Sequence, residues 1–168
     1  MKIILKTARC YLREMDPILD ATNAFELNRD FEVVRYTGDV AFENSATAKK
    51  FLENYKDYER FNMGRWAVIR KKDEIWLGWC GLKYLPDTAE VDLGYRFHQK
   101  FWNQGYATET ALACIEYGFD KLFLERIVGR AESANIGSIR VLEKCGMKFF
   151  RHTNFNGNAG VEYEIKKE

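Results

Sequence analysis

The chain has 168 residues, of which 46% are hydrophobic and 30% charged, a composition that excludes a disordered segment or a small disulfide-stapled module. The 26 Lys and Arg residues nearly balance the 25 Asp and Glu residues, so the net charge is +1 and the basic excess on which generic nucleic-acid binding relies is missing. We therefore expect a single domain over residues 1–168 and no nucleic-acid partner.

Membrane insertion and metal binding are not indicated. The longest apolar run, 75–82, contains two glycines and is far shorter than the roughly 20 residues of a membrane span. The apolar run at 3–5 is too short for the core of a signal peptide. The four cysteines lie far apart, with no zinc-type spacing. We expect a cytoplasmic protein without a metal, in which the cysteines are buried as small hydrophobic residues.

The first third of the chain predicts one strand and two helices. Residues 9–13 are typical of a short strand. The Asp-Pro pair at 16–17 suits an N-cap and a first-turn proline, so a helix is expected over 17–28. Asn44 or Ser45 is expected to cap a second helix.

The middle of the chain changes to strand patterns. Aromatic and aliphatic residues dominate 66–69 and 75–85, and the polar turn at 71–73 between them predicts a hairpin. Residues 90–97 alternate strictly, with Val91, Leu93 and Tyr95 opposite Glu90 and Asp92, which makes this the clearest strand of the chain.

The last third predicts a long helix after Gly105, a strand at 127–131 and a helix over 135–144. Gly146 suits the positive φ that ends this helix. Two closing strands, at 149–150 and 161–165, are expected around an Asn-Gly hairpin turn at 156–157. Together these elements predict a sheet with helices on both faces.

The segment 101–109 lies between the alternating strand and the long helix. A tight turn into a helix start leaves backbone N–H groups without partners, which is a favourable place for a phosphate. Gly105 and Ala107 keep bulky side chains away from that backbone. The segment is neither a Walker loop, because no Gly-Lys-Ser/Thr follows, nor a dinucleotide fingerprint, because it has one glycine.

A second segment, 135–147, begins with Asn135, which is a good helix cap, and places Ser138 three residues later near the same face. Together with Asp92-Leu93-Gly94-Tyr95, the segments 102–109 and 135–146, in this order and spacing, resemble the GNAT superfamily of acyl-CoA-dependent N-acetyltransferases. The opening strand at 9–13 is similar to that of its RimJ/RimL-type branch, which acetylates ribosomal-protein N-termini. The resemblance covers nearly the whole chain.

The resemblance implies an α+β fold in three layers, with a mixed, mostly antiparallel sheet of six to seven strands. It implies acetyl-CoA as cosubstrate, with the pyrophosphate on the amides of Asn103, Gln104, Gly105, Tyr106, Ala107 and Thr108. The pantetheine would run beside the strand end at Tyr95, Arg96 and Phe97, facing Asn135 and Ser138. The chain departs from the family pattern at Asn103, where the branch usually has Gly, and at Leu142, where many members have a tyrosine acid.

The implied reaction is direct attack of an amine on the thioester, which requires a base for the ammonium proton. The candidate bases are Asp92, Glu90 and His98, of which Asp92 is preferred, and Ser138 is expected to hydrogen-bond the leaving thiolate. Glu109, in the first turn of the long helix, is expected to be structural.

Alternatives stay open at this point. The same features suit a non-catalytic acyl-CoA-binding or regulatory module, which thiol release in the presence of an amine would exclude. An RNA-associated protein would show steeply salt-dependent binding, through Arg126, Arg130, Arg140, Lys144 and Lys148. The sequence names neither the acceptor amine nor the oligomeric state.

Overall fold

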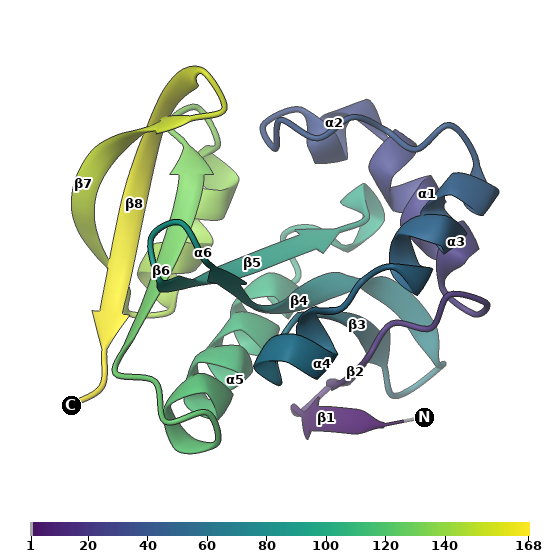
Figure 1. The fold of residues 1–168 in the computed structure, drawn as a ribbon, viewed down its shortest axis with the longest axis horizontal. Coiled ribbons are helices and arrows are strands. Elements are labelled where there is room, and N and C mark those ends of the chain that lie inside the picture. Colours follow the sequence, from purple (N-terminus) through teal and green to yellow (C-terminus); the bar gives the residue numbers. More distant parts are fainter. Residues whose placement is uncertain (1) are drawn as a thin grey trace.

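The computed structural model describes residues 2–168, which contain one eight-stranded sheet in the order β1-β2-β3-β4-β5-β6-β8-β7 (Figure 1). Only β5 and β6 pair in parallel, and every other neighbouring pair is antiparallel. The strands are β1 (Ile3–Lys6), β2 (Cys10–Arg13), β3 (Arg65–Arg70), β4 (Ile75–Leu85), β5 (Glu90–Phe97), β6 (Arg126–Glu132), β7 (Lys148–Phe155) and β8 (Asn158–Lys166).

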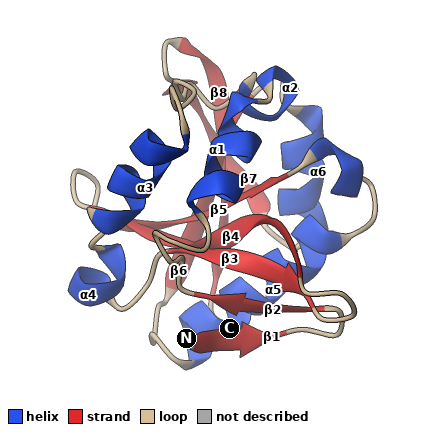
Figure 2. Cartoon of the chain, turned by 90° about the vertical axis from the view of Figure 1, so that its right-hand side faces the viewer, coloured by secondary structure: helices blue, strands red, loops and turns tan. Residues whose placement is uncertain are grey.

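Helices lie on both sides of this sheet (Figure 2). The helices within residues 21–53 pack on one face, whereas the helices 57–61, 106–120 and 136–144 contribute side chains to the main hydrophobic cluster. The helices are α1 (Ala21–Arg29), α2 (Phe31–Val34), α3 (Ser45–Glu53), α4 (Asp57–Phe61), the 3-10 turn η1 (Gln99–Phe101), α5 (Tyr106–Asp120) and α6 (Ile136–Lys144).

Alternation along the strands divides the core between the two faces. On β3, Trp66 and Val68 are buried in the main cluster, to which α5 contributes Cys114 and Ile115. Ala67 and Ile69, one residue out of phase, pack instead with Leu27 of α1. This division follows from the two-residue period of a strand, which sends neighbouring side chains to opposite faces.

The predicted fold class is confirmed, with corrections to the strand count and one boundary. The sheet has eight strands rather than six to seven, because the four-residue β1 adds an edge strand. Helix α1 begins at Ala21 rather than at residue 17. The Asp16 carboxylate caps only a turn, by accepting from the amides of Ile18 and Leu19. The short helices α2 and α4 have too few turns for a periodic signal.

Several local predictions are confirmed. Asn156 and Gly157 both have positive φ, of 51° and 86°, as the predicted hairpin turn requires. Gly146 follows α6 with φ of 80°. All four cysteines are buried and free of disulfides. Over residues 2–168, no helix combines the length and apolar character needed to cross a membrane.

Candidate active site

The two parallel strands at the centre of the sheet separate after a short contact. β5 and β6 pair only at Asp92–Val128 and Leu93–Gly129, although β5 continues to Phe97. On its other side β6 pairs with β8 along its whole length, and beyond Leu93 and Gly129 the strands β5 and β6 diverge (Figure 1). The peptide groups of β5 from Gly94 onward that point toward β6 therefore have no strand partner, so an extended ligand can pair with them.

A cavity of about 660 Å³ opens where these strands diverge. This volume lies within the usual range for small-molecule sites. One wall comes from α1, α3 and residues 36–42, and the opposite wall comes from the start of α6 and the tip of the β7–β8 hairpin. The floor is formed by alternate residues of β3, β4 and β5, namely Arg65, Trp79, Lys83, Asp92, Gly94 and Arg96.

The turn between β5 and α5 has the backbone geometry expected of an anion site. Asn103 and Gly105 have positive φ, of 58° and 82°. Asparagine tolerates this conformation better than most residues, so the departure at Asn103 leaves the turn intact. No side chain caps α5, whose N-cap is Gly105. The amides of its first turn are therefore not blocked by a capping side chain, and they carry the positive end of the helix dipole.

Arg9 and Glu109 hold this turn against β2. Glu109 accepts hydrogen bonds from the Thr7 hydroxyl (2.6 Å) and from the Arg9 amide (2.8 Å) and Nε (2.6 Å). Burial alone would raise the pKa of Glu109, but these hydrogen bonds lower it. Arg9 Nη1 donates to the Gln104 carbonyl at 2.9 Å. Glu109 therefore has the structural role expected from its sequence position, and Arg9 brings a guanidinium beside the turn.

Tyr95 joins the end of β5 to the start of α6. The Asn135 side chain caps α6 by accepting from the Ser138 amide at 3.2 Å. The Tyr95 hydroxyl donates to the Ser138 carbonyl at 2.7 Å and lies 3.1 Å from its Oγ. Burial raises the pKa of Tyr95 well above its ordinary value. The three residues line one cavity, so they are brought together as expected, and the hydroxyl contact is an addition from the structure.

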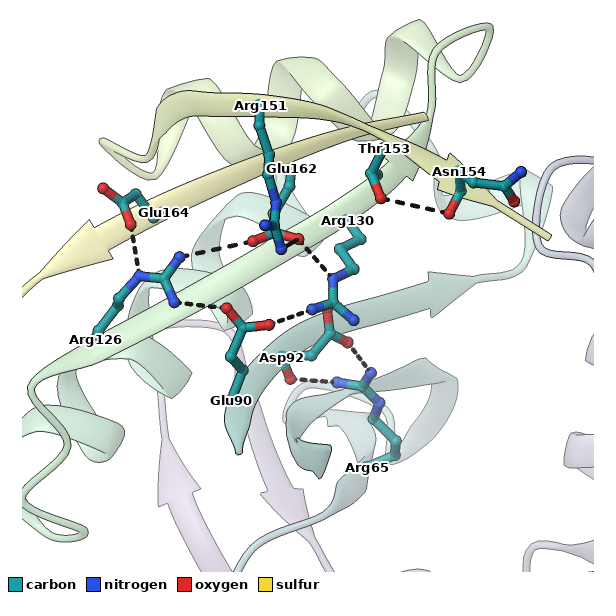
Figure 3. A network of polar contacts seen from close by, with 10 residues as sticks. All are labelled: Arg65, Glu90, Asp92, Arg126, Arg130, Arg151, Thr153, Asn154, Glu162 and Glu164. Atoms are coloured by element: carbon teal, nitrogen blue, oxygen red, sulfur yellow. Dashed lines mark hydrogen bonds and ion pairs between the residues drawn. The ribbon is translucent and has the colours of Figure 1, made fainter. Parts of the chain in front are cut away.

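Asp92 lies on the cavity floor in an ion pair with Arg65 (Figure 3). Arg65 Nη2 donates to Asp92 Oδ2 at 2.5 Å, and Nη1 donates to the Asp92 carbonyl at 3.0 Å. Oδ1 of Asp92 accepts no hydrogen bond from residues 2–168, and it is not fully buried. Burial raises the pKa of Asp92, and the Arg65 charge only partly offsets this effect.

The other two candidate bases lie outside this cavity. Glu90 is held by Arg126 and Arg130, at 2.7 Å from Arg126 Nη1 (Figure 3). Burial works against ionisation of Glu90, but the hydrogen bond from Arg126 and the charges of both arginines lower its pKa. His98 lies edge-to-face against Trp76, with ring centroids 5.7 Å apart, and lines a different hollow. Of the three carboxylate and imidazole candidates, only Asp92 lines the cavity.

Sequence reasoning missed Arg65, and it assigned Arg96 to cofactor binding without foreseeing where its side chain goes. Arg96 donates to Asn28 Oδ1 at 2.7 Å and to Asp39 Oδ2 at 2.5 Å, so its guanidinium lies on the α1 side of the cavity. The Phe97 side chain is buried in the core. Arg96 and Phe97 therefore offer a ligand their backbone rather than their side chains. Arg65 directly precedes the apolar run at 66–69 and its partner Asp92 lies two strands away, so no local pattern indicated its role.

The surroundings of Leu142, Arg126 and Arg130 bear on the alternatives of a non-catalytic module and an RNA-associated protein. Leu142 is 1% exposed and packs against Gly129, where a Cβ would come within 2.5 Å of Leu142 Cδ2. The side chain at this position is therefore part of the core and supplies no hydroxyl that could act as an acid. Arg126 and Arg130 are engaged with Glu90, Glu162 and Glu164 (Figure 3). This pairing reduces their availability for RNA phosphates.

Comparisons with known proteins agree with this geometry. A family model described as "Acetyltransferase (GNAT) domain" matches residues 9–148. The uncharacterized N-acetyltransferase YnaD of Bacillus subtilis (strain 168) is 30% identical over 158 residues, which span 92% of this chain and 89% of that protein. The acetyltransferase (GNAT family) from Bacillus anthracis superposes with a TM-score of 0.82 at 25% identity, covering 99% of this chain and 98% of that one.

A further solved structure shares the fold at lower identity. The spermidine N-acetyltransferase from Vibrio cholerae, in complex with CoA and spermine, has a TM-score of 0.78 at 17% identity and covers 95% of this chain and 96% of that one. The family model spans well over half of the chain. The sheet topology, the separated central strands and this match lead to one conclusion: the chain belongs to the GNAT acetyltransferase family.

Proposed function

We propose that this protein transfers the acetyl group of acetyl-CoA to a primary amine, either a protein N-terminus or a small molecule, and that it falls in the RimJ/RimL-type branch. One observation carries the proposal. A single cavity is lined by the unpaired end of β5, by the start of α6 with Ser138, and by the carboxylate of Asp92. The branch assignment is supported by the opening strand at 9–13.

The residues present fit acetyl-CoA. The amides of the uncapped turn suit the pyrophosphate, and Arg9 adds positive charge beside them. The free edge of β5 suits the amide groups of the pantetheine arm. When bound, acetyl-CoA supplies the thioester carbonyl. The residues that would hold it are Tyr95, Arg96, Phe97, Asn103, Gln104, Gly105, Tyr106, Ala107, Thr108, Asn135 and Ser138.

Asp92 is the proposed base. An acceptor enters as an ammonium, which has no lone pair until a proton is removed. Arg65 holds one carboxylate oxygen of Asp92, and Oδ1 stays available to accept that proton, directly or through a water. Because burial raises its pKa, Asp92 is a stronger base than an exposed aspartate.

Ser138 is proposed to donate to the departing sulfur. Its hydroxyl lies 3.1 Å from that of Tyr95, so Tyr95 can orient it. As the N–C bond forms and the C–S bond breaks, the nitrogen loses two protons in total. One passes to Asp92 and solvent, and the other ends on the sulfur through Ser138. A backbone N–H on the free edge of β5 is proposed to stabilise the carbonyl oxygen.

A free-thiol assay tests the proposal. Acetyl-CoA is incubated with the protein and a panel of peptides, amino acids and small amines, and mass spectrometry identifies the acetylated product. We expect amine-dependent thiol release. Calorimetric binding of acetyl-CoA without thiol release for any amine would contradict the proposal and favour a non-catalytic acyl-CoA-binding module.

A further inference from the structure

The cavity carries more cations than carboxylates. Each of its three arginines already forms an ion pair. Arg65 pairs with Asp92, and Arg96 pairs with Asp39. Arg130 pairs with Glu90 and Glu162. Four cations and two carboxylates line the cavity, namely Arg65, Lys83, Arg96, Arg130, Asp39 and Asp92. Both of these carboxylates are therefore already engaged by an arginine, which leaves little negative charge for an acceptor that carries several cationic groups.

Lys83 is the cavity cation that has no carboxylate partner among the described residues. Among residues 2–168, no carboxylate lies within ion-pair distance of its ammonium, in contrast to the three arginines. Lys83 is directly opposite Asp92 in the register of β4 and β5, and both side chains are on the cavity face. Directly opposed residues have Cβ atoms roughly 4.5–5.5 Å apart. An unpaired cation therefore lies beside the proposed base.

Aromatic side chains form the remainder of this end of the cavity. The Trp79 ring lies near two guanidiniums, with Arg65 Cζ at 5.3 Å and Arg96 Cζ at 5.1 Å from its centroid. Phe51 of α3 lies 5.5 Å from Phe42 and 6.1 Å from Tyr55 between ring centroids, so these three residues form a connected aromatic surface around α3. These rings offer apolar contacts to an acceptor but no further carboxylate.

A hydrogen bond joins the two opposite walls of the cavity. The side-chain amide of Asn156, at the tip of the β7–β8 hairpin, donates to the Thr37 carbonyl at 3.0 Å. Gly38 lies so close to Asn156 that a Cβ there would come within 2.3 Å of Nδ2. Thr37 and Asn156 both line the cavity. This contact favours a small acceptor over the end of a folded protein.

We infer that the acceptor is a small amine bearing a carboxylate a few bonds from its nitrogen and an apolar side chain, as in an apolar amino acid, and that Lys83 binds that carboxylate. This inference rests on the proposed function. The ammonium meets Asp92 Oδ1, the carboxylate meets Lys83, and the apolar side chain lies against Trp79 and the aromatic surface around α3. A polyamine would bring additional ammonium groups toward Lys83 and the arginines.

Matched acceptors test the inference. Thiol release is measured with phenylalanine and leucine, with their amides, with phenethylamine and isoamylamine, with the tripeptide Phe-Ala-Ala, and with spermidine. A charge-assisted contact corresponds to roughly 10- to 100-fold in kcat/KM, so the free amino acids should exceed their amides by that factor. Lys83→Met should remove the difference by lowering kcat/KM for the amino acids only. Lys121→Met, at the end of α5, is the control and should leave it unchanged.

The outcomes separate the two levels of the proposal. Equal or higher kcat/KM for spermidine, the amides, the tripeptide or the decarboxylated amines would overturn the inference and leave the acetyltransferase proposal standing. Equal loss for all acceptors in Lys83→Met would also overturn it. If no amine releases thiol, the acetyltransferase proposal fails. The inference is then decided by calorimetry of phenylalanine with the CoA-saturated protein, where Lys83-dependent binding supports it and absence of binding overturns it.

Discussion

Arg65 on β3 reaches across β4 to hold Asp92 on β5. Its Nη1 also donates to the Gly81 carbonyl at 2.6 Å, midway along this path. Gly94 makes room for the guanidinium, because a Cβ there would come within 2.5 Å of Arg65 Cζ. The contact occupies one oxygen of the carboxylate and leaves the other available, so the same ion pair both orients and exposes the proposed base.

The Asp92→Asn variant should lose turnover while keeping its affinity for acetyl-CoA. General base catalysis contributes about 10²- to 10⁴-fold, so kcat should fall by a factor in this range. For the native protein, activity should fall as pH decreases through the pKa of Asp92, which burial raises above its ordinary value. Glu90→Gln is the matched control. Near-normal turnover in Asp92→Asn together with loss in Glu90→Gln would reassign the base.

The Gly105→Asp variant should bind acetyl-CoA about ten-fold or more weakly than Gly105→Asn, as measured by calorimetry. Both replacements tolerate the φ of 82° better than most residues, so their difference isolates the carboxylate. Equal affinities in two folded variants would show that no phosphate lies beside this turn.

The Asn135→Ala variant should lose about 1 kcal/mol of stability from the cap and, in addition, lose affinity for acetyl-CoA. Asn44→Ala provides a matched control, because Asn44 caps α3 in the same way, by accepting from the Thr47 amide at 2.9 Å, and does not line the cavity. If thermal melts shift equally and acetyl-CoA affinity is unchanged in both variants, Asn135 is only a cap.

Ser138→Ala should lower kcat by roughly 10- to 100-fold, which corresponds to a lost hydrogen bond to a charged atom. Tyr95→Phe should lower kcat by a smaller factor, because it removes only the group that orients Ser138. Tyr163→Phe is the control. Its hydroxyl also reaches α6, at Glu143 (3.1 Å), but it does not line the cavity. Steady-state kinetics with unchanged kcat in Ser138→Ala would remove Ser138 from the mechanism.

Stability should decline as pH falls below neutral, in part through His98. Burial, aided by the charge of Lys100, lowers the pKa of His98 in the folded state. The unfolded chain therefore takes up this proton at a higher pH than the folded chain, and stability is lost as pH falls through the unfolded value of about 6.5. Denaturant unfolding at pH 7.5 and 5.5 should show a smaller decline in His98→Gln. His152→Gln, exposed on β7, should decline like the native protein.

Local features of this protein could be predicted from the sequence because they depend on neighbouring residues. The strict alternation of 90–97 placed Val91 and Leu93 in the core and Asp92 on the opposite face, as the structure has them. The positive φ values at Asn156 and Gly146 likewise follow from residue type within a turn or helix end. The capping of α6 by Asn135 joins residues only three positions apart, so it could be predicted from the sequence as well.

Tertiary structure alone decided which charges meet in the cavity. The Arg65–Asp92 contact depends on the register of three strands, and the Arg96–Asp39 contact joins residues 57 positions apart. The alternation of 90–97 suited both Asp92 and Glu90. In the structure two arginines of β6 engage both oxygens of Glu90, which lies outside the cavity, whereas Asp92 lines it. A two-residue period determines the face of a strand on which a side chain lies, but the neighbours on that face come from strand order, which distant packing selects.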